Sequence, residues 1–125
     1  MREIIQTNNA PQAIGPYEQG IRCGNVIYTS GQIALNTDGI MAEGDVKVQT
    51  KQVLENLSAV LKAAGADLTN IVKTTVFIKD MSTFQEVNEI YAQYFSTNKP
   101  ARSCVEVSAL PKGALVEIEA IAIID

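Results

Sequence analysis

The fold of this chain is decided by two neighbouring stretches, DVKVQTKQVLENLSAVLKAA at residues 45–64 and IVKTTVFIK at residues 71–79. In the first stretch, apolar residues such as Val53 and Leu57 recur at spacings of three, four and seven, which predicts a helix with one apolar face. Gly65 follows, where a left-handed cap commonly ends a helix. The second stretch is short and rich in β-branched residues, which favours a strand. Together the two stretches predict a helix packed on a sheet.

The flanking sequence extends this pattern in both directions. Towards the N-terminus, turn residues bracket short extended runs, the clearest of which is residues 26–33. Towards the C-terminus, a second helix is predicted to begin after Ser82, with Gln85 completing a capping box. Two more strands follow, over residues 102–107 and 114–124. The predicted order is therefore strands, helix, strand, helix and two strands.

This order predicts an α+β fold, with a mixed sheet of about six strands and two helices on one face. No repeat, linker or low-complexity tract divides the chain, so we expect residues 1–125 to form a single domain. The strands over residues 26–33, 71–79 and 114–124 carry apolar or small side chains on both faces. Because two helices cover only one face of the sheet, we expect other copies of the chain to cover the second face.

The composition excludes several classes of function. The chain contains no histidine, which removes Ser-His-Asp catalysis, Cys-His catalysis and the usual zinc enzyme sites, so we expect no metal. Its formal net charge of −4 provides no electrostatic footprint for nucleic acid, and we expect no nucleic-acid partner. Cys23 and Cys104 lie far apart in sequence and form no CxxC pair, so we expect two thiols in a reducing compartment.

The chain also lacks the marks of export and of membrane insertion. Residues 1–13 contain no apolar run followed by a cleavage pattern, so we expect no signal peptide. No stretch approaches the roughly 18 apolar residues of a membrane helix. With 46% apolar and 19% charged residues, the composition is that of an ordinary globular domain. We therefore expect a cytoplasmic protein with no membrane partner.

A group of charged residues stands out on the last two predicted strands. Arg102, Cys104 and Glu106 alternate onto one face of the first strand, and Glu117 and Glu119 share one face of the second. If these strands pair as a hairpin, their apolar faces must coincide. That register places the arginine opposite or diagonal to the two glutamates, with the cysteine between them.

The chemistry of this group allows two interpretations. An arginine binds a planar carboxylate through two parallel hydrogen bonds, and a glutamate can hold and activate a water molecule. At a subunit boundary, Arg102 and the carboxylates of Glu117 and Glu119 would therefore form a half-desolvated pocket with a fixed cation and a candidate general base. A cross-strand Arg–Glu pair also occurs as a purely structural feature. The spacing alone leaves both interpretations open.

Other residues near these positions have structural as well as functional interpretations. Cys104 has no histidine partner and is expected to be a small buried hydrophobe rather than a nucleophile. Tyr17, Tyr91 and Tyr94 are expected to be core or interface aromatics. The Ser30–Gly31 pair sits at a strand end, where its backbone N–H groups either face a ligand anion or simply begin a turn.

Four segments resemble the RidA family of reactive-intermediate deaminases, which is also called the YjgF family. The segments are AIGPYEQG (13–20), YTSGQI (28–33), VKTTVFIKDM (72–81) and PARSCVEVSALPKGALVEIEAIA (100–122). The resemblance runs over nearly the whole chain. It implies a chorismate-mutase-like α+β fold and a homotrimer with three clefts between subunits.

The resemblance also implies an activity. Members of the family hydrolyse 2-iminobutanoate and 2-iminopropanoate to 2-keto acids and ammonia, without a cofactor. These species are released by pyridoxal-phosphate dehydratases, and their removal would protect such enzymes from 2-aminoacrylate. The alternatives are a non-catalytic trimer that binds 2-keto acids and regulates a partner, and an endoribonuclease or translation inhibitor. The net charge of −4 and the lack of histidine disfavour the last of these.

Carried over by position, the resemblance assigns roles to particular residues. Arg102 would grip the substrate carboxylate, Glu117 would position or activate the attacking water, and Tyr17 would line the cleft. Four further positions would surround the ligand: Ser30, Gly31, Asn88 and Cys104. Lys99 departs from the aromatic residue that many members have at this position, in a loop that borders the cleft, so the resemblance implies less about substrate range than about the reaction.

Overall fold

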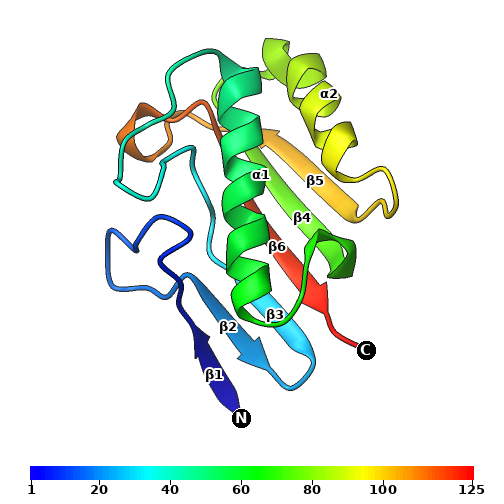
Figure 1. The fold of residues 1–125 in the computed structure, drawn as a ribbon. Helices are drawn as coiled ribbons and strands as arrows, with labels where there is room; N and C mark the ends of the chain where they lie inside the picture. Colours follow the sequence, from blue (N-terminus) through cyan, green and yellow to red (C-terminus); the bar gives the residue numbers. More distant parts are fainter.

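The computed structural model describes residues 1–125 without a gap. Two helices, α1 (Val46–Ala63) and α2 (Phe84–Tyr94), lie on one sheet (Figure 1). The six strands in chain order are β1 (Arg2–Ile5), β2 (Gly20–Cys23), β3 (Val26–Thr29), β4 (Ile71–Ile78), β5 (Ala101–Glu106) and β6 (Val116–Ile123). Short 3₁₀ turns precede β4 and α2, and another lies between β5 and β6.

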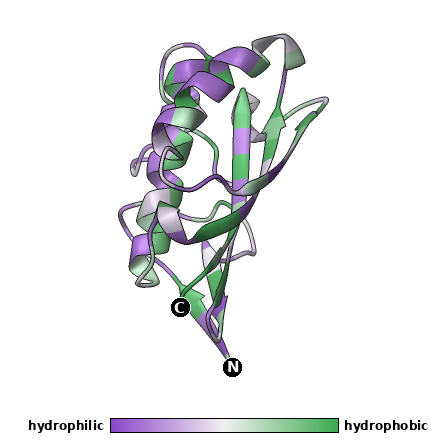
Figure 2. Ribbon diagram, turned by 90° about the vertical axis from the view of Figure 1, so that its right-hand side faces the viewer, coloured by the Kyte–Doolittle hydropathy of each residue, from purple (hydrophilic) through white to green (hydrophobic).

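The sheet is mixed, and its strand order is β1-β2-β3-β6-β4-β5. Every neighbouring pair is antiparallel except β4 and β5, which are parallel. Seen from the side, both helices lie against the same face of the sheet, and the other face carries no helix (Figure 2). The prediction of a six-stranded α+β fold with two helices on one face is confirmed.

The core lies between the helices and the covered face of the sheet. Val53, Leu57 and Leu61 of α1 are fully buried in one cluster with strand residues such as Val76 and Ile118. These α1 residues belong to the apolar face whose helical spacing is visible in the sequence, so that prediction is confirmed. Neither helix combines the length and the apolar character that crossing a bilayer requires.

The start of α1 follows its local sequence closely, and the start of α2 does not. Asp45 caps α1 by accepting hydrogen bonds from two backbone N–H groups, and Gly65 has the positive φ of +80° that was expected after the helix. The predicted capping box of Ser82 and Gln85 is wrong. Asp80 caps a 3₁₀ turn instead by accepting a hydrogen bond from the Ser82 N–H, and α2 begins after this turn with no side-chain cap.

The pairing of the last two strands also differs from the prediction. β5 and β6 do not form a hairpin, because β4 lies between them and pairs with both. β4 is eight residues long and rich in β-branched residues, so it offers two edges with a full set of backbone donors and acceptors. The connection from β5 to β6 contains a 3₁₀ turn at Pro111–Gly113 and passes the end of β4, where the Lys79 N–H donates to the Leu115 carbonyl.

The uncovered face of the sheet carries apolar side chains. Ile4, Ile21, Tyr28 and Ile121 lie in register on four consecutive strands. Ile4 is 64% exposed and Tyr28 is 49% exposed, although both are large apolar residues. A row of this kind is typical of a surface that another chain covers. Its coverage by further copies of this chain stays a prediction.

Candidate active site

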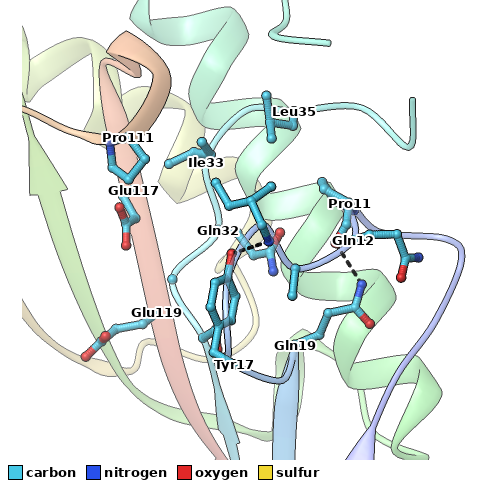
Figure 3. Close-up of a pocket in the computed structure, with 14 residues that line it drawn as sticks. Pro11, Gln12, Tyr17, Gln19, Gln32, Ile33, Leu35, Pro111, Glu117 and Glu119 are labelled. Carbon is cyan, nitrogen blue, oxygen red and sulfur yellow. Dashed lines mark hydrogen bonds between the residues drawn. The ribbon is translucent and has the colours of Figure 1, made fainter. Parts of the chain in front are cut away.

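A pocket of about 450 Å³ opens beside β6 on the uncovered face (Figure 3). It is lined by the loop before β2, by the segment that follows β3, and by Pro111 and two side chains of β6. Four of the residues selected from the sequence meet here: Tyr17, Ser30, Gly31 and Glu117. The remaining three, Asn88, Arg102 and Cys104, do not line this pocket.

Glu117 projects from β6 towards the segment after β3. Gln32 and Ile118 exchange two backbone hydrogen bonds, of 2.9 and 3.1 Å, which hold that segment against the strand. A side-chain methyl group at Gly31 would overlap the Glu117 carboxyl group, so this close approach requires glycine. The carboxyl group therefore lies directly beside the Gly31 backbone.

The environment of Glu117 keeps its carboxyl group poorly solvated. Burial raises the pKa of Glu117, and the negative charge of Glu119, two residues along the same strand, raises it further. No cation compensates this charge, because the single ion pair of the molecule joins Lys47 to Glu89. A carboxylate with a raised pKa and no counter-charge is suited to accept a proton from a bound water molecule.

The two residues at the strand end have different roles. The Ser30 N–H donates to the Gln19 carbonyl at 2.9 Å, and the Ser30 hydroxyl donates to the Glu18 carbonyl, so both groups of Ser30 hold the loop before β2. The Gly31 N–H makes no backbone hydrogen bond, and the side of Gly31 on which a Cβ would stand faces the Glu117 carboxyl group. Of the two alternatives left open by the sequence, ligand contact through a free N–H fits Gly31 and turn formation fits Ser30.

Tyr17 forms one wall of the pocket from the loop before β2. It is 44% exposed, and its hydroxyl oxygen accepts a hydrogen bond of 3.2 Å from the Ile14 N–H (Figure 3). Its hydroxyl proton is thus left available for a ligand. Its exposure excludes a core position for Tyr17, and its assignment as an interface aromatic stays a prediction.

Gln19 is a site residue that the sequence did not single out. Its side chain is only 3% exposed, and its amide bonds the backbone of Thr7 and Pro11, which fixes the loop that carries Tyr17. A glutamine between Gly15 and Gly20 resembles any solvated turn residue, so its burial could not be read from local pattern.

A second group of residues gathers at the edge strand β5. Arg102 points to α2, where its Nη1 donates a hydrogen bond of 2.7 Å to Asn88 Oδ1. Its guanidinium carbon lies 4.8 Å from the centre of the Tyr91 ring and 5.4 Å from that of Phe84. Because the one ion pair of the molecule lies elsewhere, Arg102 is a half-buried cation without a carboxylate partner.

Cys104 lies two residues beyond Arg102, on the same face of β5. Burial raises the pKa of the Cys104 thiol, and the positive charge of Arg102 opposes that shift. A raised pKa leaves the thiol protonated and unreactive at neutral pH. The structure thus agrees with the interpretation of Cys104 as a partly buried apolar side chain.

The expected proximity of Arg102 to Glu117 within one chain is wrong. Arg102 pairs with the fully buried Thr74 and lies on the helix-covered face, whereas Glu117 pairs with Phe77 and lies on the open face. β4 separates them, so one chain carries two half-sites on opposite sides of its sheet. A structural Arg–Glu ion pair, the alternative interpretation, is absent for the same reason.

The chain is similar to known proteins along nearly its whole length. A model of the family described as Endoribonuclease L-PSP matches residues 7–124. The chain is 54% identical to a RutC family protein of Pyrococcus horikoshii, over 98% of both chains. It is 51% identical to human 2-iminobutanoate/2-iminopropanoate deaminase, over 98% of this chain and 90% of the human protein.

Solved structures of relatives share the complete fold. The crystal structure of Escherichia coli TdcF with bound serine superposes with a TM-score of 0.94 at 45% identity, covering 98% of this chain and 99% of that one. The structure of the YjgF gene product of the same organism gives a TM-score of 0.95 at 49% identity, covering 98% of this chain and 99% of that one. The chain therefore belongs to the Endoribonuclease L-PSP family, the RidA or YjgF family that its sequence motifs resemble.

Proposed function

We propose that this protein is a 2-iminobutanoate/2-iminopropanoate deaminase, which hydrolyses 2-imino acids and their enamine tautomers to 2-keto acids and ammonia. The observation that carries the proposal is a pair of uncompensated charges: the Arg102 cation without a carboxylate and the Glu117 carboxylate without a cation. The similarity of about 50% to mammalian deaminases over nearly the whole chain supports it.

Arg102 is the anchor of the substrate in this proposal. A guanidinium group has five N–H donors, and one of those of Arg102 donates a hydrogen bond to Asn88. The others can hold the planar carboxylate of a small 2-imino acid through two parallel hydrogen bonds. Asn88 acts through Arg102 in this arrangement, and Cys104 completes the wall beside it.

Glu117 is the base. A water molecule beside Glu117 transfers a proton to the carboxylate while its oxygen bonds to C2 of the imine. The electron pair of the C=N double bond moves to the nitrogen, which takes that proton from Glu117 to give a neutral carbinolamine. The carbinolamine then collapses: its hydroxyl proton passes through Glu117 to the nitrogen, the C2–N bond breaks, ammonia leaves, and C2 becomes the carbonyl of the keto acid. In this proposal the Gly31 N–H and the Tyr17 hydroxyl, from two residues that line the pocket, stabilise the negative charge that develops during the addition. The imine is already electrophilic, so the proposal needs no cofactor.

The complete site requires two copies of the chain. Neighbouring strands are about 4.8 Å apart and successive residues rise about 3.3 Å. Arg102 and Glu117 are two strands apart and offset by three residues along β4, so their backbones lie roughly 14 Å apart in addition to facing opposite sides. A four-carbon acid cannot touch both within one chain. We therefore propose a homotrimer in which each cleft takes Arg102 from one copy and Glu117 from its neighbour. The apolar row on the open face supports this assembly.

The proposed physiological role follows from the chemistry of the substrate. Elimination of water from serine or threonine on pyridoxal-phosphate enzymes releases enamines such as 2-aminoacrylate, which attack the same class of enzyme. Hydrolysis before that attack would protect those enzymes. The compartment that fits this role is the cytoplasm.

A second candidate is a trimer that binds 2-keto acids without turnover. The relative solved with bound serine favours it, because that ligand is a small carboxylic acid. Arg102 would serve either function, but a regulator has no use for the desolvated Glu117. An endoribonuclease, which the family description mentions, is disfavoured by the net charge of −4 and the absence of histidine.

A coupled assay tests the proposal. Threonine dehydratase generates 2-iminobutanoate, semicarbazide competes for it, and release of 2-oxobutanoate is followed with and without this protein. We expect faster release with the natural chain and loss of the acceleration in Arg102→Ala, while Lys51→Ala, which removes one exposed positive charge from α1, behaves like the natural chain. A folded protein that binds 2-oxobutanoate and gives no acceleration would replace the proposal with the regulator.

A further inference from the structure

We propose that Tyr91 is a positioning residue, whose ring holds the Arg102 guanidinium in the orientation that binds a substrate carboxylate. The inference rests on the proposed function for the identity of the ligand. It assigns a role in the site to a tyrosine that the sequence pattern presents as a core aromatic.

Three residues of α2 converge on Arg102. Phe84, Asn88 and Tyr91 stand at positions i, i+4 and i+7, which form one stripe along a helix. The two rings lie 5.4 and 4.8 Å from the guanidinium carbon, within the range of a cation–π interaction, and the amide between them accepts the 2.7 Å hydrogen bond. The stripe therefore contacts the guanidinium through two rings and one hydrogen bond.

The kind of contact suits a residue that must remain available to a ligand. A carboxylate partner would neutralise Arg102 and occupy its N–H donors. Aromatic rings stabilise the cation through their faces and use none of those donors. The rings also restrict the conformations of the long Arg102 side chain on the edge strand. Without them, the side chain would lose its conformational entropy only when substrate binds. Tyr91 thus lowers the cost of binding without competing for the substrate.

The Tyr91 ring is held in place by Thr74 and Phe95. Its hydroxyl lies 2.8 Å from the Thr74 hydroxyl, in a buried hydrogen bond, and its ring centre lies 4.5 Å from that of Phe95. Thr74 is the residue of β4 that pairs with Arg102, so the strand beside the arginine orients the ring that contacts it. Burial raises the pKa of Tyr91, although Thr74 and Arg102 oppose the shift, so the hydroxyl stays neutral. The chain of contacts runs from β4 through α2 to β5.

The test compares Tyr91→Leu, which removes the ring, with Tyr91→Phe, which keeps the ring and removes the hydroxyl. We expect Tyr91→Leu to weaken binding of 2-oxobutanoate and to raise KM roughly 5- to 30-fold, the range of a partly desolvated cation–π contact, with a smaller change in kcat. Tyr91→Phe should lower Tm, because Thr74 loses its partner, while affinity stays close to that of the natural chain. The matched control is Tyr94→Leu, since the Tyr94 hydroxyl bonds Glu55 instead.

A double-mutant cycle separates this role from a general effect on folding. The Arg102→Ala background is inactive, so the cycle is read as the Kd of 2-oxobutanoate. In that background Tyr91→Leu should weaken the residual binding no further, because the ring acts through the arginine. An equal loss in both backgrounds, or unchanged affinity in folded Tyr91→Leu, would overturn the proposal. If Tyr91→Leu does not fold, Phe84→Leu runs the same cycle, since its ring lies nearer the start of α2.

An NMR measurement keeps the inference distinct from the proposed function. The Arg102 Nε–H signal should be shifted by the ring currents of Tyr91 and Phe84 in the free protein, and Tyr91→Leu should move it towards the position of an exposed arginine. If the natural chain shows no turnover, the deaminase proposal is refuted, but the shift of the Arg102 Nε–H signal can still be measured and still tests the role of Tyr91. An Nε–H signal that is unshifted in the natural chain would refute the role of Tyr91 whatever the activity.

Discussion

At Glu117, burial and the neighbouring Glu119 act in the same direction, and both raise the pKa of the Glu117 carboxyl group. The folded chain therefore binds this proton more tightly than the unfolded chain does. The resulting contribution to stability is fully present at low pH, below the pKa of the unfolded chain, and is lost as pH rises through the folded-state pKa. The charged form of Glu117 lowers the stability of the folded chain, and a functional role explains why such a group is present.

We therefore expect Glu117→Gln to gain stability over the natural chain as pH rises. Near pH 4 both side chains are largely neutral, so the two Tm values should lie close together. Near pH 7 only the natural chain carries the buried charge, so Glu117→Gln should melt at the higher temperature. Thermal unfolding of both proteins across this range measures the difference, and a difference independent of pH would contradict the assignment. Turnover of the natural chain should fall on acidification, with a midpoint above the roughly 4.3 of an unperturbed glutamate.

Gly31 permits a second prediction at the same scale. Its backbone does not have a positive φ, so alanine is compatible with the main chain, but the new methyl group would collide with the Glu117 carboxyl group. The end of a glutamate side chain can move aside, so we expect Gly31→Ala to fold with nearly unchanged Tm. Displacement of the base should lower kcat by about 100-fold or more. Natural turnover in this variant would show that the carboxyl group is not needed where it lies.

Among the elements, those with local signals could be predicted from the sequence. The period of apolar residues in α1, the Gly65 cap that follows it and the β-branched run of β4 each depend on residues close together in the sequence. Pairing partners depend on distant residues. Alternation along β5 and β6 correctly grouped the residues that share a face within each strand. It does not identify the neighbouring strand, and β4 pairs with both β5 and β6 where a hairpin was expected.

The same distinction applies to the candidate site. The pattern of charges on apolar strands singled out Arg102 together with Glu117 and Glu119, because such charges are costly to bury. The resemblance to the family then selected Glu117. The separation of Arg102 from Glu117 by β4, the burial of Gln19 and the rings around Arg102 could not be predicted, because each arises from segments far apart in the chain. The spacing of Phe84 and Tyr91 places both rings on one face of a helix, but it does not show that they contact a residue of β5.

For the whole molecule, the two half-sites on opposite faces of the sheet lead to a prediction about mixed assemblies. Arg102→Ala and Glu117→Gln should each be inactive alone. After co-expression, a cleft that takes its arginine from one copy and its glutamate from another is intact in about one quarter of random pairings. We expect close to that fraction of natural activity in purified mixed oligomers. Absence of any recovery, with mixing confirmed by mass spectrometry, would place both residues in one chain's site.

The strand order also bears on how the chain is made. β6 (Val116–Ile123) lies between β3 and β4 in the sheet, yet it is the last of the six strands to be synthesised. Until then β3 and β4 have no common neighbour, and the Leu-rich face of α1 has only part of its sheet to cover. Domains generally fold as units during synthesis. This sheet cannot close before β6 has been made, so the chain that precedes Val116 exposes apolar surface until then, and a truncation before Val116 would remove a central strand of the sheet.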